Sequence, residues 1–417
     1  MNRCNRTRSV ALGGLAALTA ATACAPPTLE ELGETLFIEE TFEGNGRTCS
    51  TCHEPEQFGT ITPEHVQARF AEDPDDVLFR AIDSDDGLGE SYTRMLTHAT
   101  IRVPMELATD SLTGLSVRRC DAPELTEVML NRGNPTMFNA ALEDLLMVDG
   151  READDLETQA QNAVTTHNEP GRAARPEELV AIAAFQRSLF SHADLGAFLE
   201  RAEEMGLPVG TSPAEVRGRA FFEPNRQCGT CHSGPMLNTT SDFHDVTVGS
   251  RFETVLVGAE PDNPNPKYDW CWVDPETNEI VPGPDGSERV FPGPVADPGM
   301  VILPGAMVFT GPDGTVDTIP NGALGQLAGP TFKIPTLWGV PNTAPYFHDN
   351  SAKTLEEVLE QYNFMFGQFT DFARHVGCDP EAAECLSARD RADIIAFLQL
   401  LAFEGPGRGS STAGAGP

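Results

Sequence analysis

Two copies of the five-residue pattern Cys-x-x-Cys-His constrain this chain more than any other feature of its sequence. The first copy occupies residues 49–53 and the second residues 228–232. This spacing is the attachment signature of c-type haem, in which both thiols bond to the macrocycle and the adjacent histidine ligates the iron. Zinc is the alternative for two Cys-x-x-Cys pairs. Pairs that bind zinc normally lie about 15–20 residues apart, whereas the pairs here lie far apart, at residues 49–52 and 228–231. The sequence therefore predicts two covalently bound haem c groups, attached through Cys49, Cys52, Cys228 and Cys231, with His53 and His232 as iron ligands.

A helical segment precedes each motif, so the two halves of the chain share one plan. Residues 29–40 are amphipathic and lead to the first motif, and residues 214–222 run directly into the second. The repeated plan indicates an internal duplication, with one unit over residues 29–200 and another over residues 212–403. Further segments whose apolar residues recur near the helical period are 156–164, 176–190, 354–364 and 388–403.

The second unit contains a segment of different composition. Between residues 258 and 325, proline, glycine and aspartate replace the helical pattern, and short strand-like runs alternate with turn residues. We expect hairpins and loops inserted into the second unit here. The C-terminal residues 405–417 are rich in glycine and serine, which predicts a disordered tail.

The N-terminus has the layout of a secretory signal. Basic residues precede an apolar run over residues 10–23 that is too short to span a bilayer stably. Small residues then precede Cys24, as at a bacterial lipoprotein cleavage site, and ordinary cleavage nearby is the alternative. We expect residues 1–24 to be a signal peptide and the protein to be periplasmic, with a lipidated Cys24 as its candidate tether to the membrane.

Four cysteines lie outside the leader and the two motifs. Cys378 and Cys385 flank a short acidic loop, so we expect them to form one disulfide, which leaves Cys120 to pair with Cys271. Disulfides persist in the oxidising compartment that an exported protein reaches. Sequence alone does not fix connectivity, and unpaired buried thiols are the alternative.

The chain is strongly acidic. Its 63 acidic and 28 basic residues give a formal net charge of −35. This charge argues against nucleic-acid binding, which needs clustered lysine and arginine. It favours a protein partner with a basic docking patch, because complementary charge steers encounter.

Several stretches beyond the two motifs resemble one family. They are residues 332–363, which include Pro-Tyr-Phe-His at 345–348, residues 132–140 (Arg-Gly-Asn-Pro-Thr-Met-Phe-Asn-Ala), Asp-Gly-Arg at 149–151, and Cys-His-Ser-Gly-Pro at 231–235. In these residues the chain resembles the bacterial dihaem cytochrome c peroxidases, a family that includes MauG. The resemblance implies a mainly α fold, with two cytochrome c-like haem domains that face each other and a Pro/Gly-rich loop and hairpin insertion in the second.

The resemblance also assigns roles to the two haems. By motif order, the haem on His53 would react with peroxide and the haem on His232 would relay electrons. The family places a glutamine and, ten residues on, a glutamate over the reactive iron, and these positions are Gln159 and Glu169 here. Glu169 would act as a proton shuttle, because O–O cleavage needs a base that takes one peroxide proton and returns it to the leaving oxygen.

An axial ligand of the second haem follows from the same resemblance. In the family it lies fourteen residues after the histidine that is His348 here, as methionine in the peroxidases and tyrosine in MauG, and this position is Tyr362. Thr354 and Glu357 are spaced as a capping box at the start of the helix that would carry it. Met365 lies on nearly the same helix face and is the rival ligand, and a core tyrosine without contact to iron is the other alternative.

Two family features are altered in this chain. The tryptophan between the haems falls at Val148, an aliphatic side chain that cannot carry an electron hole. The asparagine of a calcium site between the domains falls at Gly133, so only Thr343 and Pro345 match, through their backbone carbonyls, with Asn134 as a substitute ligand. Calcium is therefore a second candidate metal, held by hard oxygen ligands.

Three histidines outside the motifs are candidates for contacts near the haems. His65 and His98 are candidate sixth ligands of the first haem in a resting state, and a surface position is the alternative for both. His348 is expected to hydrogen-bond near the second haem rather than bind iron.

The sequence thus leads to three functional hypotheses. The first is a periplasmic dihaem oxidoreductase that reduces hydrogen peroxide with electrons from a small redox protein. The second is a MauG-like enzyme that oxidises a protein or an organic substrate through a high-valent dihaem state. The third is a non-enzymatic dihaem electron-transfer cytochrome without an open coordination site.

Overall fold

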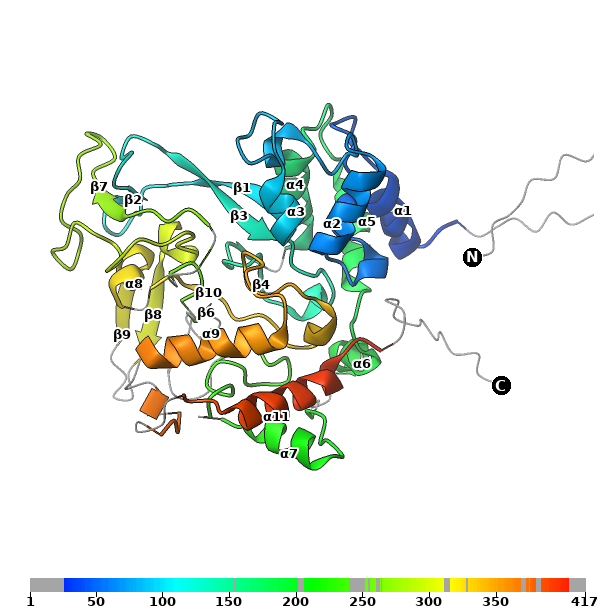
Figure 1. Cartoon of the computed structure of the whole chain (residues 1–417). Helices are drawn as coiled ribbons and strands as arrows, with labels where there is room; N and C mark the ends of the chain where they lie inside the picture. The colour runs from blue at the N-terminus through cyan, green and yellow to red at the C-terminus, as the bar shows by residue number, and fades with distance from the viewer. Residues whose placement is uncertain are drawn as a thin grey trace, which may run out of the picture.

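The architecture was analysed in a computed structural model of the chain (Figure 1). Within residues 26–404, it describes all but residues 154, 202–205, 225, 240–251, 254–255, 260–262, 264, 311–315, 328, 369–372, 375 and 380–383. The predicted signal peptide, the Cys24 tether and the predicted tail lie outside the described residues. None of the helices in the described part of the chain is long and apolar enough to span a bilayer.

The first half of the chain contains six helices among the described residues. They are α1 (Leu29–Glu39), α2 (Pro63–Glu72), α3 (Thr93–His98), α4 (Leu156–His167), α5 (Pro176–Arg187) and α6 (Ala193–Arg201). Helices α1 and α5 approach closely at Gly33, where a Cβ atom would lie 1.9 Å from the carbonyl oxygen of Ala181. One helical turn further, the rings of Phe37 and Phe185 pack with centroids 5.3 Å apart. The predicted helices at 29–40, 156–164 and 176–190 are confirmed.

The second half repeats this helix pair. Its helices are α7 (Pro213–Ala220), α8 (Asn321–Leu327), α9 (Leu355–Gln368) and α11 (Ala388–Leu398). A Cβ atom at Gly218 in α7 would lie 1.9 Å from the carbonyl oxygen of Asp393 in α11. Phe222 and Phe397 then pack with ring centroids 5.0 Å apart. The two halves therefore use the same residue types at the same helix contact, which supports the predicted duplication.

The first half also contains strands that the sequence analysis did not predict. Strand β1 (Thr100–Glu106) pairs antiparallel with β3 (Glu127–Gly133), with Val103 opposite Leu130. The side chains of both residues are buried, as are those of Ile101 and Met105. Ile101, Val103 and Met105 alternate with Arg102, Pro104 and Glu106, which is the period of two typical of a half-buried strand, and the sequence prediction overlooked this pattern.

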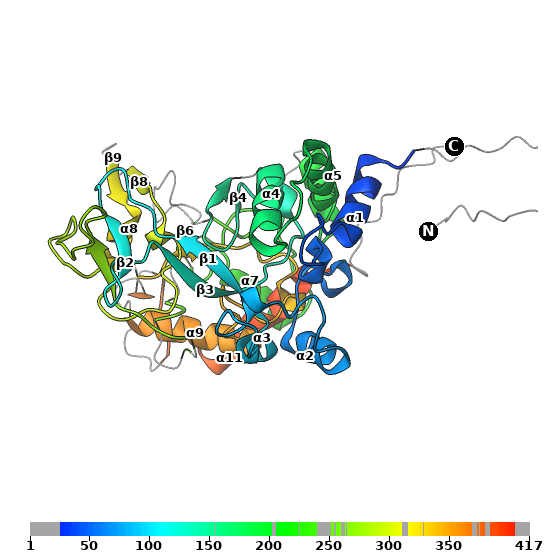
Figure 2. The same cartoon turned by 90° about the horizontal axis from the view of Figure 1, so that it is seen from above.

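The apolar core of the inserted segment is shared with the first half of the chain. Strand β7 (Trp270–Val273) pairs antiparallel with β2 (Ser116–Arg119), and the two buried tryptophans of β7 share one core with residues of β1 and β3. In both views, β2, β7, β8 (Ala306–Thr310) and β9 (Val316–Pro320) lie at the end of the molecule opposite α1 (Figures 1 and 2). The remaining strands are short: β4 (Leu145–Leu146), β5 (Glu152–Ala153), β6 (Phe252–Glu253) and β10 (Phe332–Lys333).

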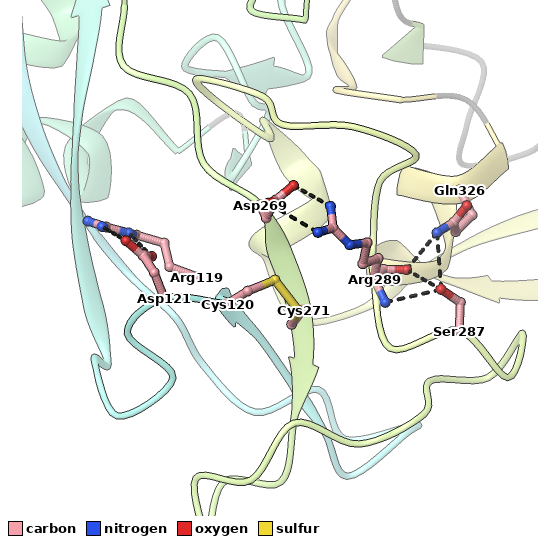
Figure 3. Close-up of a disulfide and its surroundings, with 8 residues drawn as sticks. All are labelled: Arg119, Cys120, Asp121, Asp269, Cys271, Ser287, Arg289 and Gln326. Atoms are coloured by element: carbon pink, nitrogen blue, oxygen red, sulfur yellow. Dashed lines mark hydrogen bonds and ion pairs between the residues drawn. A yellow bond between two sulfur atoms is a disulfide. The ribbon is translucent and has the colours of Figure 1, made fainter.

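A disulfide joins the inserted segment to the first half. Cys120 and Cys271 are bonded at the end of the β2–β7 pair (Figure 3). Arg289, also in the insertion, forms an ion pair with Asp269 beside this bond, and the guanidinium of Arg119 lies 3.8 Å from the ring centroid of Tyr268. Cys378 and Cys385 form the other disulfide. Both predicted pairings are confirmed.

Candidate active site

Two cavities lie inside the protein, and each is lined by one Cys-x-x-Cys-His motif. The first has a volume of about 410 Å³ and is lined by Cys49, Cys52 and His53. The second has a volume of about 360 Å³ and is lined by Cys228, Cys231 and His232. Most of the other lining side chains are apolar, as a buried macrocycle requires.

The motif histidines are oriented alike in the two cavities. His53 donates a hydrogen bond from Nδ1 to the carbonyl oxygen of Gly59 at 3.0 Å, and His232 donates from Nδ1 to the carbonyl oxygen of Leu237 at 2.7 Å. Burial lowers the pKa of both imidazoles, that of His232 to about 4. A neutral imidazole whose Nδ1–H is held by a carbonyl presents Nε2 as a metal ligand. Both sites therefore fit an iron-ligating histidine.

A Pro-Thr turn supports each motif from the opposite side. Thr136 donates from its hydroxyl to the carbonyl oxygen of Phe58 at 2.7 Å, and Thr336 donates to the carbonyl oxygen of Met236 at 2.8 Å. Pro135 and Pro335 precede the two threonines. The duplication thus extends from the helices to the loops that cover the haem sites.

The same duplicated turns join the two halves of the molecule to each other. The backbone N–H of Gly133 donates to the carbonyl oxygen of His348 at 2.7 Å, and that of Lys333 donates to the carbonyl oxygen of Val148 at 2.9 Å. Gly133 precedes the first Pro-Thr turn by two residues, as Lys333 does the second. The two bonds are therefore reciprocal, as expected for an interface between two copies of one unit.

A wall of residues shared by both cavities separates the two sites. It consists of Gly133, Asn134, Pro135, Thr136, Ala140, Leu146, Met147 and Val148. Val148 thus lies between the cavities, where the resemblance placed the tryptophan of the family. None of these described wall residues is aromatic, so the wall offers no ring that could carry a hole between the haems.

A buried ion network holds this interface together. Arg132 donates from Nε to Asp297 at 2.7 Å and from Nη1 to Asp149 at 2.5 Å. Asp297 belongs to the inserted segment and lies 3.8 Å from Nε2 of His348. The Arg132 guanidinium lowers the pKa of both carboxyl groups against the effect of burial. The insertion therefore reaches the contact between the two halves through one carboxylate.

Helix α9 places a tyrosine opposite the second motif histidine. The hydroxyl oxygen of Tyr362 lies 3.4 Å from Nε2 of His232. Leu355 and Leu359 of the same helix are buried and line the cavity. Met365, the rival ligand, is buried and lines the same cavity three residues further along. Only for Tyr362 is a direct approach to the histidine seen among these described residues.

Helix α4 occupies the equivalent place over the first motif. A short hairpin precedes each helix, with Leu146 opposite Glu152 in the first and Tyr346 opposite Ala352 in the second. The helices then begin at equivalent leucines, Leu156 and Leu355. Counting seven residues from each leucine pairs Ala163 with Tyr362, and Ala163 lines the first cavity. Where the second site has a phenol, the first has a methyl group.

Two further side chains of α4 line the first cavity. Gln159 and His167 lie one turn before and one turn after Ala163, so all three share one helix face. The amide of Gln159 approaches the sulfur of Met147 in the shared wall at 3.9 Å. The sequence analysis named Gln159 but gave His167 no role.

Glu169 lies outside the first cavity, in contrast to the expectation from the resemblance. Helix α4 ends at His167, and the chain then turns, with Glu169 at a φ of +45°. The Glu169 side chain is exposed and accepts a hydrogen bond from Nδ2 of Asn45 at 3.0 Å. The same Asn45 amide donates to the carbonyl oxygen of His167 at 2.9 Å. Glu169 therefore ties the end of α4 to the loop before the first motif.

His65 and His98 also lie outside both cavity linings. Nε2 of His65 is 3.3 Å from a carboxylate oxygen of Glu54, and Nδ1 of His98 is 2.8 Å from the hydroxyl of Thr97. Neither placement supports a sixth ligand. His348 is buried, stacks on Phe332 with ring centroids 3.9 Å apart and lines the second cavity, close to the second haem site as expected.

The predicted calcium site stays a prediction. Thr343 and Pro345 line the second cavity. The amide of Asn134, proposed as a substitute ligand, donates instead to the carbonyl oxygen of Cys52. The side chain of Asn350 fills the space beside Gly133, where a Cβ atom would lie 2.1 Å from its Oδ1. The bond from Asn134 to Cys52 is made by Nδ2, so a role of Asn134 as a calcium ligand through Oδ1 stays a prediction.

Sequence comparison finds a family model that matches the first part of the chain. The sequence model of the di-haem cytochrome c peroxidase family matches residues 27–193, which include the first motif and helix α4. No curated protein compared with the chain is significantly similar to it. Residues 27–193 are thus similar to the di-haem cytochrome c peroxidases, which supports an oxidoreductase.

Solved structures of two such proteins align with most of the chain. A MauG-like protein associated with microbial copper homeostasis is 17% identical, with 92% of this chain and 90% of that chain covered and a TM-score of 0.46. The diheme peroxidase BthA from Burkholderia thailandensis is 15% identical, with 93% of this chain and 90% of that chain covered and a TM-score of 0.43. Scores at this level add nothing to the assignment of individual residues.

Proposed function

We propose that this protein reduces hydrogen peroxide at a haem in the first cavity, with electrons that a small redox protein delivers through a haem in the second. One observation carries the proposal: the equivalent helical positions over the two motif histidines hold Ala163 and Tyr362. With its hydroxyl 3.4 Å from His232 Nε2, Tyr362 would hold an iron there together with the histidine. Alanine would leave the equivalent position at the first site open for a molecule as small as peroxide.

The residues of the first cavity suit this reaction. When bound, haem supplies the one-electron chemistry and the open coordination site that peroxide reduction needs. His53 is held by Gly59 in the tautomer that ligates iron. Gln159 lies on the same helix face as Ala163, where its amide is placed to hydrogen-bond the incoming peroxide. The remainder of the lining is part apolar and part polar, with Arg47, Arg132 and Arg151 as its positive charges.

The second cavity suits electron relay. Tyr362 and His232 would hold its iron from both sides, which leaves no position for substrate. The wall between the cavities includes Val148 rather than an aromatic ring, so electrons would cross by direct tunnelling between the two haems. The net charge of −35 favours a donor with a basic docking patch. We also propose that the protein is exported to the periplasm. It would carry covalent haem c at both motifs and be held at the membrane by a lipid on Cys24.

Oxidation of a protein or organic substrate is the second candidate function. The observation that favours it is Tyr362 rather than Met365 opposite His232, because tyrosine is the ligand that the resemblance gives for MauG. The third hypothesis, an electron-transfer cytochrome closed at both irons, is disfavoured by Ala163.

Stopped-flow mixing of the dihaem protein with hydrogen peroxide tests the proposal. With a reduced small c-type cytochrome as donor, we expect catalytic turnover in which two donor molecules are oxidised for each peroxide. A rapid reaction with peroxide but no turnover of the donor would favour the oxidation of another substrate. Haems that are low-spin at both sites and inert to peroxide would contradict both enzyme functions.

A further inference from the structure

We propose that His167 is the catalytic residue that meets peroxide over the first haem and carries its proton. This inference rests on the proposed function, since it assigns a role at the same site. It replaces Glu169, the residue expected from the family resemblance, with a histidine that the structure places in the cavity.

The position of His167 on α4 is the first argument. Gln159, Ala163 and His167 follow one another at intervals of four residues and line the first cavity together. Ala163 occupies the place of the closing tyrosine, so His167 lies one turn from the open axial position. The equivalent residue of α9, eleven positions after its first leucine, is the buried Phe366. The polar side chain is therefore specific to the open site.

The surroundings of His167 give the second argument. Its Nδ1 atom is buried and has no hydrogen-bond partner among the described residues. A buried imidazole nitrogen without a partner is costly unless a ligand or water satisfies it. Burial lowers the pKa of His167 to about 4, Asp83 opposes this shift, and the nearby Arg47, His53 and Arg151 add smaller effects that lower the pKa. The imidazole is therefore neutral near pH 7 and able to accept a proton.

Glu169, the alternative base, lies outside the first cavity. Glu169 is exposed and bound to Asn45 on the outer side of the loop. Asn45 also binds the carbonyl oxygen of His167, and Nδ2 of Asn168 donates to the carbonyl oxygen of Arg47 at 2.8 Å. These bonds fix the end of α4 against the loop before the first motif, which keeps the His167 side chain at the cavity and the Glu169 side chain away from it.

The proposed step conserves protons and electrons. Reduction of one hydrogen peroxide to two waters breaks the O–O bond and consumes two electrons and two protons, the electrons coming from the small redox protein through the haems. His167 takes the proton of the oxygen nearer the haem and gives it to the far oxygen, which leaves as water. The imidazole is neutral before and after this transfer, which only moves a proton within the peroxide. Both protons that the net reaction consumes come from solvent and convert the remaining oxygen to the second water.

Two substitutions in the dihaem protein test this role. His167→Leu removes the polar group at similar volume, and His167→Gln keeps a hydrogen-bond donor that cannot take up and return a proton. We expect both to slow the reaction with peroxide by about 10²–10⁴, the usual contribution of general acid–base catalysis. The infrared C–O stretch of carbon monoxide bound to the ferrous first haem gives an independent readout. It should rise in His167→Leu, which loses the hydrogen bond, and stay near the parent value in His167→Gln.

The controls separate the outcomes. Gln161→Leu, on the same helix but outside the cavity lining, should leave the C–O stretch and the peroxide rate unchanged, and Glu169→Gln should do the same. An unshifted C–O stretch in His167→Leu would show that the imidazole does not meet the ligand and would overturn the proposal. So would a fast peroxide reaction in both His167 variants, or a slow one in Glu169→Gln alone. If the parent protein itself is inert to peroxide, the proposed function fails, while the C–O stretch still reports the position of His167.

Discussion

The two haem sites differ where it matters for chemistry and agree almost everywhere else. Both have a motif histidine held through Nδ1 by a carbonyl, a Pro-Thr turn and a helix that begins at an equivalent leucine. They differ at several cavity-lining positions of that helix, where Gln159, Ala163 and His167 of α4 correspond to Val358, Tyr362 and Phe366 of α9. Under the proposed function, the comparison teaches that one repeated scaffold would supply both a reactive site and a relay site through differences at a few side chains of one helix.

The largest expected effect follows from removing one motif at a time. Replacing Cys49 and Cys52 by alanine, or Cys228 and Cys231 by alanine, should lower the haem content from two to one per chain in the pyridine haemochrome assay. The first variant should lose all reaction with peroxide, because only the relay site remains. The second should still react with one equivalent of peroxide but should no longer turn over the donor. Two haems retained in either variant would contradict covalent attachment at that motif.

A smaller effect is expected from opening the second site. Tyr362→Phe removes the hydroxyl that approaches His232 and should change the electron paramagnetic resonance signal of the second haem. Its reduction potential should rise by on the order of 100 mV, because axial ligands tune haem potentials over about 0.8 V and a phenolate stabilises ferric iron. Met365→Leu is the matched control and should alter neither quantity. The Tyr362 assignment is wrong if only the Met365 variant changes the signal.

The smallest expected effect tests whether the two scaffolds are equivalent. Gly33→Ala and Gly218→Ala each place a methyl group against a backbone carbonyl of the facing helix. Each should lower the free energy of unfolding by about 1–3 kcal/mol, the usual cost of overpacking, and the two losses should be similar. Urea unfolding measures both, with Gly206→Ala as the control because no atom lies within 4 Å of its Cβ position. A large loss at one glycine alone would limit the equivalence to the haem pockets.

The sequence predicted the features that are encoded by local residue types. Cys-x-x-Cys-His needs only five neighbouring residues, and the six helices named from periodicity all form because their apolar faces repeat at the helical period. Both disulfide pairings were also predicted, and Tyr362 lies opposite His232 as the family resemblance implied.

The features that the sequence analysis missed depend on tertiary structure. The docking of the insertion on β2 joins residues about 150 positions apart, as the 151-residue separation of Cys120 and Cys271 shows, and no local pattern encodes such a pairing. Glu169 was counted from a family spacing, but α4 ends two residues earlier and the chain turns outward. An alignment of the two halves on their Pro-Thr turns and first helical leucines would have paired Ala163 with Tyr362 and drawn attention to His167.

The most direct test of the central claim is to close the first site with the residue that closes the second. In Ala163→Tyr, both haems should remain attached, the first haem should become six-coordinate in its absorption spectrum, and stopped-flow mixing should show loss of the reaction with peroxide. Gln161→Tyr, which adds the same side chain outside the cavity lining, should react as the parent protein does. Peroxide reduction at the parent rate in Ala163→Tyr would contradict the account, because it would show that the open position over His53 is not where peroxide reacts.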